Sequence, residues 1–302
     1  MGISQRFPDR RRAGASLDRT DCRRGRDIAP FSHGEQVLNE HGHWWAVVMG
    51  TEAKNPVKTT ETTFEIVNSL MALDGAGVTE VATHLDLPKS TVHNYLSTLE
   101  QEEYVVKDGS TYRIGVRFLE LGAHARDNKP VYEVARPEVD RLAERTGELS
   151  NLLIEEHGLG IYLHQATGEQ SVSVDATSGS RVYLHETALG KAILSGYSAD
   201  RVDAIIDRHG LPRSTDRTTG DPAELKHELA EVRERGYAVD DEERLRGLRC
   251  IGAPIRSDDG ETLGAISVSA PANRMRGAYF EEELPNVLLE TTNVIELNLT
   301  YS

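Results

Sequence analysis

The 302-residue sequence predicts an α+β protein with a small, mostly helical N-terminal domain, a short connecting helix and a larger C-terminal α/β domain. Three observations lead to this prediction. Apolar residues recur at helical spacing between positions 60 and 101, two short alternating runs follow them directly, and helical and strand-like patterns alternate after position 131. A hydrophobic content of 38% is sufficient for two cores of ordinary size.

The first 55 residues have no sustained hydrophobic period and begin with clusters of arginine. We expect residues 1–55 to be disordered or to precede the true start, with Met49 as an alternative initiator. The histidines and the cysteine of this segment lack the spacing of metal ligands, so no metal site is expected there.

Residues 56–115 read as a winged helix-turn-helix. A helix at 60–73 ends at Asp74-Gly75, a short helix starts near Thr79, and Leu87-Pro88 turns the chain into a second helix at 89–101. Two short helices across a tight turn form this motif. Alternating runs at 104–107 and 111–114, joined by Asp108-Gly109-Ser110, predict the hairpin that forms the wing.

The second helix of this motif has an apolar face and a polar face. Val92, Leu96 and Leu99 recur at core spacing, which leaves short polar side chains on the other faces. Such side chains can bind base edges and phosphates in a major groove of double-stranded DNA. The candidate DNA-binding residues are Lys89, Ser90, Thr91, His93, Asn94, Ser97 and, in the wing, Arg113. A module that binds another protein is the alternative.

The charge balance is unusual for a protein that binds DNA. Residues 56–125 contain five basic and ten acidic residues, and the chain as a whole has a formal net charge of −15 with only 7 lysines. An acidic surface of this kind suits a cell with molar internal salt, in which repulsion from phosphates is screened within about 3 Å. We therefore expect a halophilic protein, although an ordinary solvated acidic surface would look the same.

A linker helix is expected at 116–128, where Phe118, Leu119 and Leu121 are followed by Asn128-Lys129-Pro130. Residues 129–302 then form the α/β domain, with Asp258-Asp259-Gly260 as a hairpin turn. Helices are predicted at 131–146, 187–195, 201–206, 224–235 and 280–297, and strands at 152–154, 161–163, 172–174, 237–239, 250–255 and 263–269.

Composition argues against several classes of protein. No run of about 20 apolar residues is present, so no membrane span is expected. The two cysteines lie far apart, which argues against a disulfide framework and indicates a reducing, cytoplasmic compartment. No nucleotide-binding loop, zinc-protease motif or catalytic triad stands out, so we expect neither a cofactor nor enzymatic activity.

Five ordered motifs with compatible spacing carry a specific resemblance. TEVATHLDLPKSTVHNYLSTLEQEEYV, followed by a short linker helix, precedes HETALGKAIL, GYAVDDEERLRGLRCIGAPI and LGAISVSAP. Over residues 60–298 the chain thus resembles the IclR family of transcriptional regulators. The resemblance implies a GAF-like effector-binding domain, a homodimer or homotetramer on a palindromic operator, and a small organic acid as effector.

The resemblance also implies an effector pocket. The backbone amides of Ala188 and Leu189, at the start of a helix, would bind a carboxylate, because a helix N-terminus attracts anions. Gly190 would keep that approach open, and Asp240 would accept a hydrogen bond from a polar group of the ligand. The implied effector residues are Ala188, Leu189, Gly190, Asp240, Leu248, Cys250, Ser267 and Ser269.

The pocket residues have other interpretations. Leu248 would shape the pocket by packing alone, while Cys250 would by default be a buried core residue. A GAF-like enzyme is the remaining alternative, with Cys250 as nucleophile and His164 or His185 as base.

Overall fold

The computed structural model describes residues 37–38, 44–45, 53–172, 174 and 176–301. Most of the segment predicted to be disordered, including Met49 and the cysteine and histidines considered as metal ligands, lies outside these residues. Inside it, the two-residue strands β1 (Val37–Leu38) and β2 (Trp44–Trp45) pair in antiparallel fashion. No helix of the described residues is long and apolar enough to cross a membrane.

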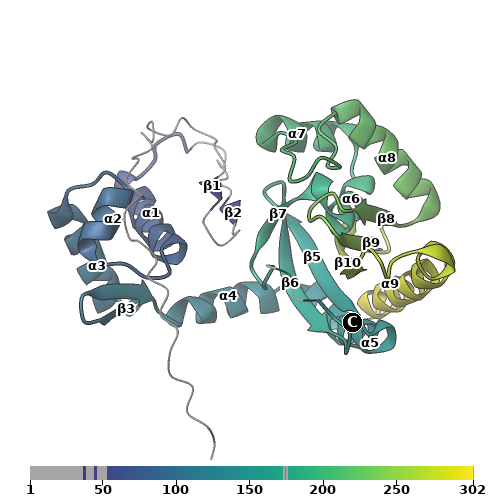
Figure 1. Ribbon diagram of the computed structural model, residues 1–302, viewed down its shortest axis with the longest axis horizontal. Coiled ribbons are helices and arrows are strands. Elements are labelled where there is room, and N and C mark those ends of the chain that lie inside the picture. Colours follow the sequence, from purple (N-terminus) through teal and green to yellow (C-terminus); the bar gives the residue numbers. More distant parts are fainter. Residues whose placement is uncertain (1–36, 39–43, 46–52, 173, 175, 302) are drawn as a thin grey trace, which may run out of the picture. The chain divides into compact units, whose positions relative to one another are not determined.

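The first folded unit is a winged helix-turn-helix, as predicted. Its elements are α1 (Lys58–Ala72), α2 (Val78–His84), α3 (Lys89–Gln101), β3 (Val105–Asp108) and β4 (Thr111–Ile114). The core residues Val81, Val92 and Leu96 are completely buried. The wing turns at Gly109, whose φ of 61° suits a glycine. Figure 1 shows the three helices and the β3–β4 hairpin.

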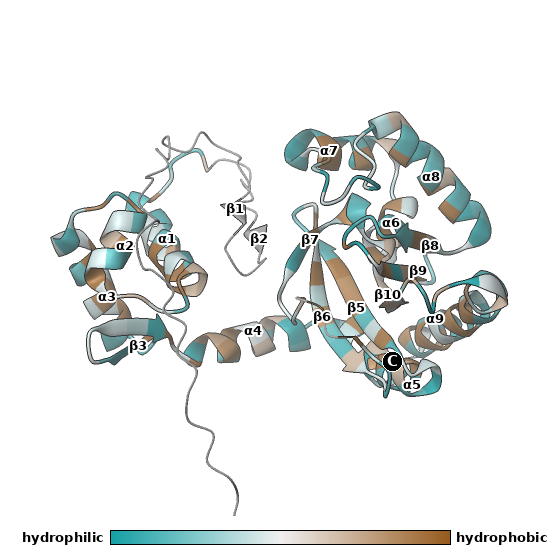
Figure 2. Ribbon diagram, in the orientation of Figure 1, coloured by the Kyte–Doolittle hydropathy of each residue, from teal (hydrophilic) through white to brown (hydrophobic). Residues whose placement is uncertain are grey.

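The helix α4 (Arg117–Asp127) corresponds to the predicted linker helix. Its first turn packs on the winged unit, because the rings of Phe118 and Tyr104 lie 4.9 Å apart and Arg117 Nη1 donates to the carbonyl of Glu102 at 2.6 Å. Leu119 and Leu121 are 71% and 52% exposed, and the helix has no buried residue. Apolar segments therefore interrupt its polar surface (Figure 2).

The C-terminal unit is built on a six-stranded sheet in which neighbouring strands are antiparallel. The strand order is β7-β6-β5-β10-β9-β8. The strands are β5 (Leu149–Glu156), β6 (Leu159–Thr167), β7 (Arg181–Tyr183), β8 (Ala238–Asp241), β9 (Leu248–Arg256) and β10 (Thr262–Pro271). The helices are α5 (Pro130–Thr146), α6 (Ala188–Ser195), α7 (Ala199–His209), α8 (Pro222–Arg235) and α9 (Leu284–Thr300), with short turns at Leu184–Glu186 and Tyr279–Glu283.

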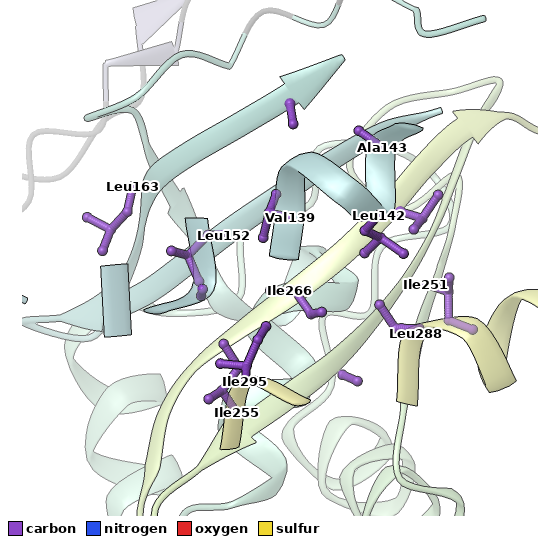
Figure 3. Packing of buried hydrophobic residues seen from close by; sticks show 14 of the residues in the cluster. Val139, Leu142, Ala143, Leu152, Leu163, Ile251, Ile255, Ile266, Leu288 and Ile295 are labelled. Carbon is purple, nitrogen blue, oxygen red and sulfur yellow. The ribbon is translucent and has the colours of Figure 1, made fainter. Parts of the chain in front are cut away.

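Helices cover both faces of this sheet. α5 and α9 pack on one face (Figure 3), while α6, α7 and α8 pack on the other. The alternation of β10 shows how the sequence divides the faces: Ile266 and Val268 belong to the core under α5 and α9, so Ser267 and Ser269 point toward the opposite face. The two serines thus share a face.

In the C-terminal unit, one predicted strand is wrong and one strand was missed. The described residues of the predicted strand at 172–174, Val172 and Val174, lie outside any strand and pack instead against Ala188, Leu248 and Cys250. Their alternation resembles a strand because both side chains contact one apolar wall. The edge strand β7 at 181–183 was missed, since three residues are too few to show a period.

Candidate nucleic-acid interface and ligand cavity

The helix α3 presents a polar surface away from the core of its domain. Lys89, Ser90, His93 and Asn94 are exposed, while Thr91 and Ser97 are half-buried. The apolar side chains of Val92, Leu96 and Leu99 occupy the opposite face and anchor the helix. The structure therefore places all six candidate residues of α3 where they do not serve the core.

Arg113 has a structural partner that the sequence did not reveal. Its Nη1 donates to the carbonyl oxygen of Asp74 at 2.7 Å and lies 3.7 Å from the carboxylate of the same residue. The guanidinium thus fastens the wing to the turn that follows α1. Of the predicted DNA-binding residues, all of which the structure describes, Arg113 is the one whose side chain forms a hydrogen bond and an ion pair within the domain.

A cavity lies between the sheet and the N-terminus of α6. Its empty volume is about 340 Å³, which includes space open to solvent. Seven of the eight predicted effector residues line it. The lining residues are Leu149, Asn151, Tyr162, Val174, Thr187, Ala188, Leu189, Asp240, Arg244, Leu248, Cys250, Ser267 and Ser269.

The N-terminus of α6 forms one wall of the cavity. Thr187 caps the helix, and its side-chain oxygen accepts a hydrogen bond from the Gly190 amide at 2.9 Å. The amides of Ala188 and Leu189 come first in the helix and have no acceptor within it. These two amides and the helix dipole make the wall suitable for an anion.

Gly190 does not have the predicted role. It is absent from the cavity wall, and its amide is already used by Thr187. A Cβ atom at this position would lie 2.1 Å from the carbonyl oxygen of Leu184. The glycine therefore lets α6 pack tightly against the preceding turn, and it does not keep a path open for a ligand.

The floor of the cavity is a short hydrogen-bonded chain of polar side chains. Asn151 on β5 donates to the hydroxyls of Ser267 and Ser269 at 3.3 and 3.5 Å. Gln165 on β6 donates to the side-chain oxygen of Asn151 at 3.0 Å, which orients the amide. These groups give a small ligand both donors and acceptors on a buried surface.

Asp240 and Cys250 are paired across β8 and β9 and differ in charge. Burial raises the pKa of Asp240 to about 6, so this carboxyl is largely ionised at neutral pH. Its Oδ1 accepts from the backbone amides of Glu243 and Arg244 at 2.8 and 3.4 Å. Burial raises the pKa of the Cys250 thiol well above its usual value, so the thiol stays neutral.

A neutral, buried thiol is a poor nucleophile, and neither predicted base accompanies it. Nε2 of His164 lies 2.6 Å from Oδ1 of Asp140, and Nε2 of His185 donates to the carbonyl oxygen of Pro212 at 2.8 Å. Neither histidine lines the cavity. The arrangement required for catalysis by Cys250 is therefore not formed by the described residues.

Comparison with known proteins assigns both halves of the chain. Residues 59–109 match the IclR helix-turn-helix domain, and residues 123–296 match the domain described as bacterial transcriptional regulator IclR C-terminal. The chain belongs to the IclR family. A similar relative is a probable HTH-type transcriptional regulator ArcR of Halobacterium salinarum, which is 36% identical over 239 residues, 78% of this chain and 91% of that protein.

Solved structures of IclR proteins share the fold. The IclR protein of Thermotoga maritima matches with a TM-score of 0.68 and 29% identity over 81% of this chain and 99% of its own. An IclR homologue of Microbacterium hydrocarbonoxydans, described as complexed with 4-hydroxybenzoate, matches with a TM-score of 0.66 and 23% identity over 80% of this chain and all of its own (100%). The second likeness shows the fold alone.

Besides Thr187, five residues of the cavity wall in this IclR protein were not predicted from the sequence to line the pocket. Leu149 and Asn151 are two residues apart on β5 and so point to the same face, and Tyr162 belongs to β6. Arg244 lies in the loop between β8 and β9, within a run of charges that reads as a solvated turn. Val174 was predicted to lie in a strand at 172–174, which the structure does not contain at the described positions. Only the register of the strands and the path of the loop bring these residues together.

Lys191 of α6 is a second missed feature, because a lysine in a helix is expected at the surface. Its side chain is completely buried, and its Nζ lies 2.6 Å from both Glu228 on α8 and Glu243 in the β8–β9 loop. Burial raises the pKa of Glu243 to about 7, although the charge of Lys191 opposes this shift. The cluster ties the cavity wall and the loop together.

Proposed function

We propose that this IclR-family regulator binds a palindromic operator through α3, and that a small, anionic metabolite in the C-terminal cavity controls this binding. The cavity itself carries the ligand part of the proposal. A helix N-terminus, the Arg244 guanidinium and the serine hydroxyls surround it, and these groups favour an anion with oxygen atoms.

The exposed polar face of α3 supports the DNA part of the proposal. Lys89 and Asn94 project from the surface of a helix whose other face is locked into the core. Asn is suited to a bidentate contact with adenine, and Lys can bind guanine or phosphate. The affinity for DNA is therefore expected to depend on these two side chains.

The proposal is tested with the DNA of the protein's own promoter region in molar KCl. Lys89→Ala and Asn94→Ala are each expected to weaken binding by about 1–3 kcal/mol where a base contact is lost, as measured by fluorescence anisotropy. Thr60→Ala, at an exposed position of α1, serves as the control. Unchanged affinity in both α3 variants would favour a protein-binding module instead.

Exposed apolar side chains support a homodimer or homotetramer. Phe64 and Met71 on α1 are 56% and 44% exposed, and Leu119 and Leu121 on α4 are more than half exposed. Side chains of this size gain free energy when a second copy covers them. A dimer also matches an operator with two related half-sites.

A further inference from the structure

The cavity contains a guanidinium that forms no ion pair with a carboxylate of the described residues. Nη1 of Arg244 donates to the hydroxyl of Tyr162 at 3.3 Å, and no Asp or Glu oxygen of the described chain lies within the 4.0 Å ion-pair distance. Arg244 and Asp240 are the two charged side chains among the described lining residues. A guanidinium offers five donors, so most of its capacity is left for a ligand.

We propose that Arg244 binds the carboxylate of the effector, and that the cavity accepts monocarboxylates and rejects dicarboxylates. This inference rests on the proposed function of the cavity. A carboxylate and a guanidinium form paired, charge-assisted hydrogen bonds of fixed geometry. Arg244 would therefore be the residue that makes the site require an acid.

The loop that carries Arg244 is held in place before any ligand binds. Thr215 Oγ1 donates to the backbone carbonyls of Glu242 and Glu243 at 2.9 and 3.0 Å, and Lys191 binds the Glu243 carboxylate. The Arg244 amide donates to Asp240. A guanidinium on a braced loop loses little freedom on binding, which favours a specific contact.

Arg246, two residues further along the same loop, shows the contrast. Its side chain is 74% exposed and lies 3.0 Å from Asp216, which is also exposed. It is absent from the cavity wall. Arg246 therefore provides a matched control, because it has the same charge and the same loop but no access to the ligand.

The balance of charge in the cavity limits the ligand to one carboxylate. Arg244 supplies one full positive charge, whereas the α6 N-terminus supplies only a partial one. Asp240 is 1% exposed and contributes a negative charge to the same wall. A second carboxylate would be buried near Asp240 without a full positive partner, which is strongly unfavourable.

The test is isothermal titration calorimetry of the full chain at constant ionic strength. The monocarboxylates are acetate, propionate, lactate, pyruvate and benzoate, the dicarboxylates are malonate and succinate, and propionamide and benzamide lack the charge. The wild type is expected to bind at least one monocarboxylate and neither a dicarboxylate nor an amide. Arg244→Gln should weaken that binding by about 10- to 100-fold, while Arg244→Lys should retain part of it.

Controls and contrary results separate this inference from the proposed function. Arg246→Gln should change the affinity by less than about twofold, and unchanged melting temperatures would show that the variants fold. The inference is wrong if Arg244→Gln binds the acids as tightly as the wild type, or if the dicarboxylates bind equally well. If an acid releases operator DNA from the wild type and from Arg244→Gln alike, the proposed function is supported and the role of Arg244 is contradicted. If no acid of the panel binds or changes DNA binding, the role of Arg244 and the proposed function are both contradicted.

Discussion

At the scale of single residues, one glycine determines how closely α6 approaches the sheet. A Cβ atom on Gly252 of β9 would lie 2.8 Å from the carbonyl carbon of Ala188 and 2.9 Å from the amide nitrogen of Leu189. The Leu189 amide is one of the two amides of the proposed anion site. The absence of a side chain at Gly252 thus brings the first amides of α6 against the strand beside Cys250.

Gly252→Ala is therefore expected to move the α6 N-terminus, lower the free energy of unfolding by about 1–3 kcal/mol and weaken ligand binding. Chemical denaturation and calorimetry measure the two effects. Gly122→Ala on α4 is the control, since its added Cβ meets nothing within 4 Å and should be neutral or slightly stabilising. Equal stability of the two variants would contradict the packing argument.

His185 makes stability depend on pH. Burial, with a smaller contribution from Lys191, lowers its pKa from 6.5 to about 4 in the folded state. Between pH 4 and pH 6.5, His185 binds a proton in the unfolded chain but not in the folded chain. This contribution to stability is present above pH 6.5 and is lost as the pH falls toward 4.

His185→Gln removes that titration. The wild type should lose up to about 3 kcal/mol relative to the variant as the pH falls from 7 to 4. Urea denaturation at a series of pH values measures the difference between the two proteins, in which the titration of all other groups largely cancels. A difference that does not change with pH would show that His185 titrates normally in the folded protein.

At the scale of elements, α4 connects the DNA-reading unit to the effector unit. Its first turn is attached to the winged domain through Arg117 and Phe118, and α5 follows it after two residues, Asn128 and Lys129. A ligand can affect DNA binding only if it favours one arrangement of the two units over another. We expect α4 to transmit this preference, because it is a continuous helix.

Leu119→Pro tests this role, because proline in a helix interior removes a hydrogen bond and breaks the helix. Ligand affinity should stay nearly intact, whereas the ligand should no longer change DNA affinity. Calorimetry and anisotropy with the same protein measure the two quantities. Leu119→Ala keeps the helix and should preserve the coupling; equal loss of ligand and DNA binding in the proline variant would count against α4 as the transmitter.

Elements were predictable where the chain is strongly periodic. α3 has the predicted limits, 89–101, and α8 ends at Arg235, before Gly236, whose φ of 85° suits a C-terminal glycine. Prediction failed at 172–174, because an apolar alternation arises whenever side chains contact one wall, whether or not a neighbouring strand supplies hydrogen bonds. An alternation of apolar residues in the sequence therefore predicts burial more reliably than it predicts strand pairing.

At the scale of the whole molecule, charge should control how DNA binding responds to salt. The chain has a formal net charge of −15, and its reading domain is acidic as well. Most DNA-binding proteins lose affinity steeply as salt rises, because their basic residues compete with cations for phosphate. Here salt also screens repulsion between an acidic surface and DNA.

We therefore expect operator affinity to persist or rise between 0.2 and 2 M KCl, whereas a protein with 6–10 phosphate contacts loses about 10³-fold or more over a smaller interval. Anisotropy across a KCl series measures the slope. Melting temperatures recorded over the same range separate unfolding at low salt from a change in affinity. A steep loss of affinity with salt, in a protein that stays folded, would contradict a halophilic mode of binding.

The sequence by itself determined the two folded units and the helix α3, and the family resemblance in it pointed to seven residues that line the cavity. Helical period, turn residues and charge are properties of neighbouring positions, so they can be read along the chain. The tertiary structure decided which distant residues meet. Gly190 allows α6 to pack against the turn before it, Lys191 is buried between Glu228 and Glu243, and Arg244 lies in the cavity wall. These outcomes depend on strand register and on the path of one loop, because the residues concerned lie far apart in the sequence. Lys191, for example, can be buried only because folding brings Glu228 and Glu243 to it.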